Sequence, residues 1–161
     1  MKGYKAFNND LTCKGYQFTT NRLHVFDGKP MLCEQGFHFC TTLEDVVRYY
    51  HSPDMRVFEI EAGGTITNVK TDCSKRACSE IKLVKELSLD EVMLSITKSE
   101  PAYKWACKIS NKDVMINHIT ESKWAYLWAT RIGNKDIMKS RVTKPFWIQW
   151  WNDWFPNDKI I

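Results

Sequence analysis

The sequence contains no long apolar run. No uninterrupted apolar segment approaches the roughly 18 residues needed to span a bilayer, and no apolar stretch follows Met1-Lys2-Gly3 as it would in a signal peptide. We therefore expect a cytoplasmic protein that has no membrane partner. With 161 residues, of which 43% are hydrophobic and 26% charged, the chain has the composition of one folded domain or two small ones.

The sequence also lacks the Cys-x-x-Cys pairs of zinc knuckles. Its six cysteines would suggest disulfides in a secreted protein, but we expect reduced thiols where no signal peptide is seen. The residues that could bind zinc have unsuitable spacings: Cys33, His38, Cys40, His51, Cys73 and Cys78. Cys40 precedes an expected helix, where a thiolate would be stabilised, but nothing in the sequence pairs it with a base. We expect no metal and no cofactor.

Tryptophan is absent from the first 98 residues, and positive charge is in excess only after them. All seven tryptophans follow residue 98, whereas six of the eight phenylalanines precede it. Residues 1–98 contain 13 Lys or Arg and 13 Asp or Glu, while residues 99–161 contain 10 and 6. Two regions of different chemistry therefore share the chain, and we place the boundary between residues 1–87 and residues 88–161.

The second region is an internal repeat of 23 residues. Ala102–Thr120 aligns with Ala125–Thr143, IQWWNDWFPNDKII reads as a truncated third copy, and a half-unit begins near Ser88. In each unit a helix with small and aromatic residues is broken by an asparagine, which can cap a second, shorter helix. Neither helix can bury its apolar face alone, so we expect stacked units whose shared core contains the tryptophans of the 23-residue period.

The first region predicts strands and one clear helix. The strand-like runs are KGYKAF, GYQF with RLHVF, GFHFC, MRVFEIEA and SEIKLVKEL, and the turn-forming stretches are NND, FDGKP, HSPD and AGG. Thr41 and Glu44 have the spacing of a capping box, and the apolar residues after them predict a helix that stops before Pro53. The expected fold is α+β: a small mixed β-sheet module with one main helix, followed by a short α-helical repeat array.

Within GFHFC, the alternation of a strand places Phe37 and Phe39 on one face and His38 and Cys40 on the other. The face that carries His38 either lines a cleft or lies beneath the sheet with its polar groups hydrogen-bonded there. If the first region has a ligand site, we expect it to centre on His38.

The order of blocks in the first region resembles an uncharacterised domain found mainly in tailed phages and prophages. The blocks are MKGYKAFNNDLTCKGYQF, LCEQGFHFC with LEDVVRYY, RVFEIEAGG and KTDCSKRACSEIKLVKELSL. Repeats of the Y-x-W-A-x-x-I-G-N-K-D-I-M type accompany phage proteins as well. This resemblance implies a bacterial host cell as the setting, and it implies no particular reaction.

A weaker resemblance links GFHFC-TTLEDVVRYY to the second signature block of the ADP-ribosyltransferase superfamily. It implies that YKAF is the first strand, where Lys5 or Tyr4 replaces the family's His or Arg. It further implies three roles: Phe39 and Cys40 at the nicotinamide pocket, Tyr49 or Tyr50 as the helix aromatic, and Glu80 as the late acidic residue. Under this alternative, Glu80 and Cys40 are the candidate catalytic residues of an enzyme or an NAD-binding or nucleotide-binding protein.

Few catalytic groups pair in the sequence, so a protein that acts by binding is favoured over an enzyme. We expect a phage-encoded accessory protein, a host-interaction or counter-defence factor that blocks or sequesters a bacterial protein; nucleic acid or a nucleotide signal is the alternative target. The expected ligand residues are His38, Phe39, Tyr49, Arg56, Lys70, Lys75 and Arg76. The expected partner residues are Trp124, Arg131, Lys139, Arg141, Trp147, Trp150 and Trp154.

Overall fold

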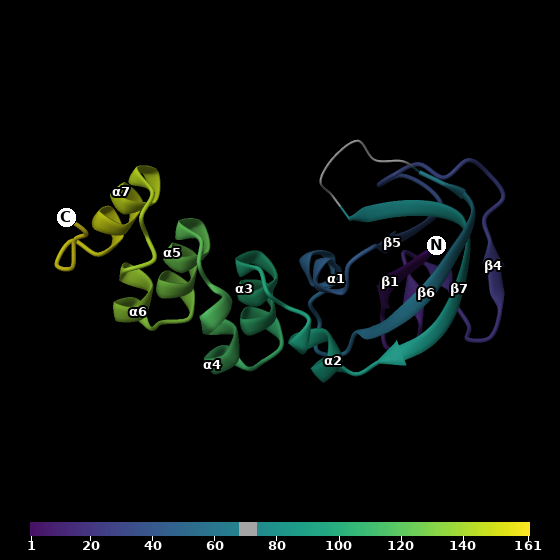
Figure 1. The fold of residues 1–161 in the computed structure, drawn as a ribbon, viewed down its shortest axis with the longest axis horizontal. Helices are drawn as coiled ribbons and strands as arrows, with labels where there is room; N and C mark the ends of the chain where they lie inside the picture. The colour runs from purple at the N-terminus through teal and green to yellow at the C-terminus, as the bar shows by residue number, and fades with distance from the viewer. Residues whose placement is uncertain (68–73) are drawn as a thin grey trace. The chain divides into compact units, whose positions relative to one another are not determined.

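The structure is a computed structural model that describes residues 1–67 and 74–161 (Figure 1). The chain is α+β, as predicted, and it divides into two compact units, Met1–Ile96 and Thr97–Ile161. The strands belong to the first unit, and the second unit is helical. Lys70, one of the expected ligand residues, and Cys73 lie outside the described residues. No helix in the described part of the chain is long and apolar enough to cross a membrane.

The strands of the first unit form one closed, barrel-like sheet and, at the second and third strands along the chain, a separate two-stranded sheet. They are β1 (Lys2–Phe7), β2 (Thr12–Cys13), β3 (Tyr16–Gln17), β4 (Leu23–Val25), β5 (Phe37–Cys40), β6 (Arg56–Ile66) and β7 (Lys75–Leu87), and the helices are α1 (Leu43–Tyr49) and α2 (Leu89–Leu94). Antiparallel pairings join β1 to β5, β5 to β7, β7 to β6 and β6 back to β1. The long strands β6 and β7 curve around the others to close this ring (Figure 1). The sequence pattern did not predict the closure.

Aromatic side chains fill the interior of the barrel. Phe7, Phe37 and Phe39 belong to one buried cluster, whereas His38 and Cys40 lie outside it, as the alternation of a strand requires. The Phe7 ring contacts the Phe18 ring edge-on, with 4.9 Å between centroids. The predicted division of GFHFC into two faces is therefore present.

The start of α1 differs from the prediction. The residue before the helix is Thr42, one position after the expected cap at Thr41. The Thr42 hydroxyl donates to the Asp45 carboxylate at 2.6 Å, and the Thr42 side chain makes no capping hydrogen bond to the helix backbone.

The AGG stretch is not the turn that we predicted. β6 continues through it to Ile66, and the pairing of β6 with β7 shifts register between Gly63 and Ile66. Gly64 has a φ of 62°, a left-handed conformation that glycine adopts at little cost. The glycines therefore form a bulge inside a long strand, which helps the strand to bend.

The second unit consists of short helices in pairs. They are α3 (Ser99–Lys108), α4 (Lys112–Met115), the 3-10 turn η1 (Ile116–His118), α5 (Ser122–Arg131), α6 (Lys135–Lys139) and α7 (Pro145–Trp154). Trp105, Trp128 and Trp151 are at most 1% exposed, so the tryptophans of the 23-residue period are core residues. Asn111 and Asn134 precede the second helix of their pairs with φ values of 61° and 55°, and this left-handed backbone ends the first helix.

Two buried serines, 23 residues apart, make equivalent hydrogen bonds in the second unit. Ser122 Oγ accepts from the backbone N–H groups of Thr143 at 2.9 Å and Lys144 at 3.1 Å. Ser99 Oγ accepts from the corresponding backbone groups of residues 120 and 121 at 2.9 and 3.2 Å. Each serine therefore ties the first helix of its own pair to the chain that enters the first helix of the next pair.

Candidate functional site

Two adjacent cavities lie beside His38 in the first unit. The helix cavity, about 290 Å³, lies between α1 and the strands β1 and β5, and its lining includes Lys14, His38, Phe39, Tyr49, Tyr50 and Lys75. The barrel cavity, about 310 Å³, is lined by Lys5, Cys13, Phe18 and Phe37 from the barrel interior, by Tyr50, and by exposed residues that include Tyr16, Lys14, Glu34 and Gln35. Each is near the lower end of the range for small-molecule sites, which begins at about 300 Å³.

Backbone groups on the loop before β5 hold the His38 ring between the two cavities. Its Nε2 accepts from the Cys33 N–H at 2.8 Å, and a second hydrogen bond joins the ring to the Met31 backbone. Burial, followed by the charges of Lys75 and Lys14, lowers the pKa of His38 to about 4. His38 is therefore neutral near pH 7, and it positions the loop without contributing charge to a ligand.

Cationic and aromatic groups meet in the helix cavity. The Lys75 Nζ lies 4.7 Å from the centroid of the Tyr49 ring and 3.5 Å from the Cys33 Sγ. Lys14, an exposed residue, lines the same cavity. Two ammonium groups beside tyrosine rings suit a ligand that combines a planar ring with an anionic group.

The expected ligand residues fall into two groups. Those that line the helix cavity are His38, Phe39, Tyr49 and Lys75. Arg56 instead forms a bidentate pair with Glu86, with both N···O distances at 2.7 Å, between β6 and β7. Arg76 lies next to Lys75 on β7 and donates to the Lys75 carbonyl at 2.9 Å.

The structure does not bring Glu80 to Cys40, the two residues of the ADP-ribosyltransferase alternative. Cys40 pairs with Lys75 on β7, whereas Glu80, five residues further along that strand, pairs with Val25 on β4. Five residues of strand span roughly 16 Å. Of the two cavities that the described residues form beside His38, neither is lined by Glu80.

Sequence reasoning did not identify Lys5 as a buried amine. Its side chain is 4% exposed, and its Nζ donates to the His38 carbonyl at 2.9 Å and to the Cys13 Sγ at 3.3 Å. The Nζ also lies 5.3 Å from the centroid of the Phe7 ring. Burial lowers the pKa of Lys5. The sequence feature that could have identified it is the alternation of side chains along β1, which places Lys5 on the same inward face as Phe7.

A hydrogen-bonded chain leads from Lys5 to the edge of the helix cavity. The Cys13 Sγ lies 2.9 Å from the Tyr50 hydroxyl, so Cys13 contacts both Lys5 and Tyr50. Burial and the contact with Cys13 raise the pKa of Tyr50, which therefore keeps its proton near pH 7. Cys40, the candidate nucleophile, is 5% exposed. Among the described residues, no group of three or more His, Cys, Asp or Glu is placed to hold a metal ion.

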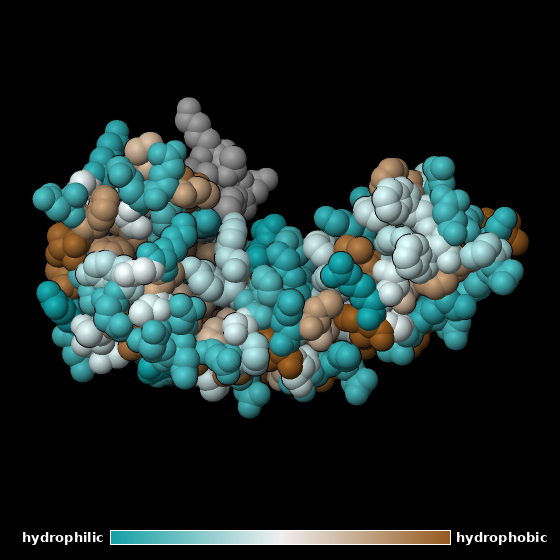
Figure 2. Space-filling model, turned by 180° about the vertical axis from the view of Figure 1, so that it is seen from behind, coloured by the Kyte–Doolittle hydropathy of each residue, from teal (hydrophilic) through white to brown (hydrophobic). Residues whose placement is uncertain are grey.

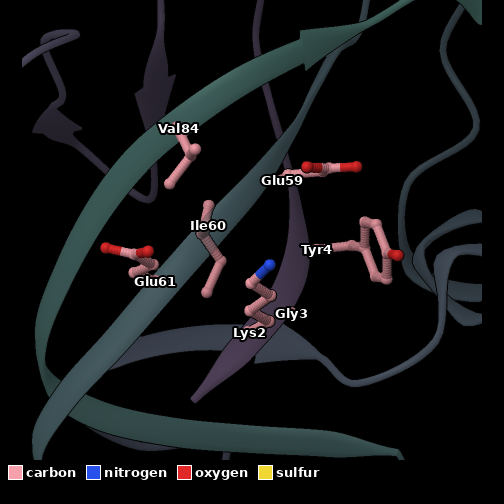
Figure 3. Close-up of a pocket in the computed structure, with 7 residues that line it drawn as sticks. All are labelled: Lys2, Gly3, Tyr4, Glu59, Ile60, Glu61 and Val84. Carbon is pink, nitrogen blue, oxygen red and sulfur yellow. The ribbon is translucent and has the colours of Figure 1, made fainter.

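A further pocket lies over β1 and β6 on the first unit. It has a volume of about 230 Å³, and Figure 3 shows the Lys2 ammonium group lying between the carboxylates of Glu59 and Glu61. Because both signs of charge line it, this pocket has no clear preference for a charged ligand. The cavities beside His38 are the stronger candidates.

The second unit carries an aromatic surface on its first helices. Tyr103 packs on Trp124 with 5.3 Å between ring centroids, and 23 residues later Tyr126 packs on Trp147 with 5.6 Å. We call the far end of this surface the terminal aromatic patch, which consists of Tyr126, Phe146, Trp147, Trp150 and Trp154. Its members Phe146, Trp150 and Trp154 are 58%, 49% and 62% exposed. In the view of Figure 2, strongly hydrophobic side chains form only small patches on a mainly hydrophilic surface.

Arg141 and Lys139 are among the expected partner residues whose charged groups make contacts within the second unit. Arg141 donates to the carbonyls of Ile116 and Ile119, the second at 2.8 Å, and so connects successive helix pairs. Lys139 forms an ion pair with Asp158 at 2.5 Å. Of the other expected partner residues, Arg131, Trp150 and Trp154 are exposed, and Trp124 and Trp147 are partly buried.

The first unit is thus an α+β module whose closed sheet carries two ligand-sized cavities. A family model described as a domain of unknown function, DUF7666, matches residues 1–95, and the chain belongs to this family. The matched residues agree closely with the first unit, Met1–Ile96. No curated protein and no solved structure is significantly similar to the chain.

Proposed function

We propose that the chain acts by binding, and that the terminal aromatic patch of the second unit holds a bacterial protein. The observation that carries the proposal is the exposure of Phe146, Trp150 and Trp154 on a single helix, α7. Large aromatic side chains contribute much of the energy of protein interfaces and are costly to leave in water.

The charge of the second unit indicates the character of the partner. Residues 97–161 contain 11 Lys or Arg and 6 Asp or Glu. Lys123 lies 4.6 Å from the Trp124 ring, beside the aromatic surface. A partner with an acidic rim around an apolar centre would complement these residues, and opposite charges would speed its association.

The setting we propose is that of a phage-encoded accessory protein, a host-interaction or counter-defence factor that blocks its bacterial target. The support is the resemblance of the sequence blocks to a domain of tailed phages. In this role the first unit would bind a small ligand in the helix cavity. The proximity of Lys75 to Tyr49 supports a ligand with a planar ring and an anionic group, such as a nucleotide signal.

The nucleotide-binding part of the alternative function is compatible with the helix cavity, but the transferase part is not favoured. Cleavage of a nicotinamide bond needs a carboxylate beside the reacting ribose. The resemblance assigns this role to Glu80. Glu80 pairs with Val25 on β4, five residues along β7 from Lys75, which is the residue that pairs with Cys40. If purified protein released nicotinamide from NAD and Glu80→Gln abolished the release, the transferase function would replace our proposal.

The proposal can be tested by affinity capture from a bacterial lysate. The wild-type chain should recover one stoichiometric protein, and Trp150→Ala should lose most of it. The matched control is Ile137→Ala on α6, because Ile137 and Trp150 are both 49% exposed. Nuclease treatment of the lysate distinguishes a protein that binds the chain directly from a protein that is held through nucleic acid. If both variants retain the partner as well as wild type does, the terminal aromatic patch is not the binding surface.

A further inference from the structure

We propose that Lys5 is a reactive amine that forms an imine with a small apolar aldehyde or ketone in the barrel cavity. This site is separate from the terminal aromatic patch, and it does not depend on the function proposed above. It rests on three features of the barrel interior: a cavity of suitable size, an amine at its wall, and proton donors joined to that amine.

The aromatic side of the barrel cavity favours an unsaturated ligand, whereas exposed polar residues, Lys14, Glu34 and Gln35, line the remainder. Tyr16 contacts Phe18 and Phe37 at centroid distances of 4.7 and 5.2 Å, so three rings form one side of the cavity. Its volume of about 310 Å³ suits a single-ring compound. Such a ligand could stack on the rings while its carbonyl group reaches Lys5.

Lys5 has surroundings that differ from those of a lysine in an ion pair. The acceptors that its Nζ contacts are the His38 carbonyl and the Cys13 thiol, and the nearest rings are those of Phe7 and Phe18. An ammonium group removed from water in this way is destabilised relative to the neutral amine, and burial lowers its pKa. The neutral amine is the nucleophilic form.

The reaction balances without an oxidant or a reductant. The lone pair of the Lys5 Nζ attacks the carbonyl carbon, the C–N bond forms, and the carbonyl oxygen takes up a proton. The nitrogen then loses a proton, and the hydroxyl group leaves as water after a second protonation, which gives a protonated imine. Loss of the remaining proton from the nitrogen completes the balance, so that the products are an imine and one water molecule. Tyr50 keeps its proton near pH 7 and contacts Cys13, which contacts Lys5, so this chain of groups can transfer protons to and from the site.

The test is reductive trapping on the wild-type protein. Cinnamaldehyde and sodium cyanoborohydride are added at pH 7.4, and modification of each lysine is followed by peptide mapping with mass spectrometry. Lys14 is the internal comparator, because it lines the same cavity but is exposed. Only about one exposed lysine in a thousand is neutral at this pH, so we expect Lys5 to react at least about tenfold faster than Lys14. If Lys5 reacts no faster than Lys14, or not at all, the proposal is wrong.

Two variants separate reactivity from structure. Lys108→Arg, at an exposed residue of the second unit, should leave the trapping rate at Lys5 unchanged, and Tyr50→Phe should slow it by removing the hydroxyl that contacts Cys13. Equal rates at Lys5 in wild type and Tyr50→Phe would eliminate the proton-transfer role of Tyr50. Because the amine itself is assayed in the wild-type chain, the main result does not depend on whether a Lys5 variant folds.

Discussion

Replacement of Ser122 by alanine should destabilise the second unit by about 2 kcal/mol. The Ser122 Oγ accepts two backbone N–H groups, those of Thr143 and Lys144, and the serine is 3% exposed. A buried donor that loses its partner costs about 1–3 kcal/mol. Thr143 and Lys144 are themselves exposed, so water can partly replace the lost acceptor. The cost per donor should therefore lie near the lower end of that range, which gives about 2 kcal/mol for the two donors together.

Urea unfolding followed by tryptophan fluorescence measures this change in the second unit, because all seven tryptophans follow residue 98. The control is Ser110→Ala, since Ser110 is exposed and its hydroxyl contacts only the neighbouring Asn111 side chain among the described residues. The control should change the free energy of unfolding by less than about 0.5 kcal/mol. A Ser122→Ala loss no larger than that of the control would refute the role assigned to the buried serine.

Three further outcomes are expected. The folded-state pKa of His38, about 4, lies below its ordinary value of 6.5, so the unfolded chain binds more protons between them and the free energy of unfolding falls as pH drops through this window. After solvent screening, this fall in the free energy of unfolding should be about 1–2 kcal/mol. Urea unfolding at several pH values should give falls of different size for wild type and His38→Gln. Gly3→Ala should cost about 1–3 kcal/mol in urea unfolding, because its Cβ would overlap the Phe39 ring. Trp128→Ala should cost about 3–5 kcal/mol by the same assay, because Trp128 is 0% exposed.

Features set by short-range sequence patterns were the predictable part of the fold. KGYKAF forms β1 over the whole of Lys2–Phe7, and the 23-residue period locates Trp105, Trp128 and Trp151 in the core. The capping box of α2, formed by Ser88 and Glu91, is a local pattern of the same kind.

The remaining features depend on contacts between distant residues. Closure of the sheet requires β6 to pair with both β1 and β7, and periodicity along one strand carries no information about its neighbours. The inward position of Lys5 was missed for a related reason, because composition favours placing a lysine outside. Arg141 looked like a surface cation, but tertiary structure directs its guanidinium group to backbone carbonyls of the preceding helix pair.

The central claim is that the chain binds a protein through the terminal aromatic patch. The most direct measurement is the Kd of the captured partner, compared between wild type and Trp150→Ala by calorimetry, with Ile137→Ala as the control. A residue of this kind at an interface centre contributes at least about 2 kcal/mol, so we predict a Kd at least about 30-fold weaker for Trp150→Ala and unchanged for the control. Equal Kd values for all three proteins would contradict the account.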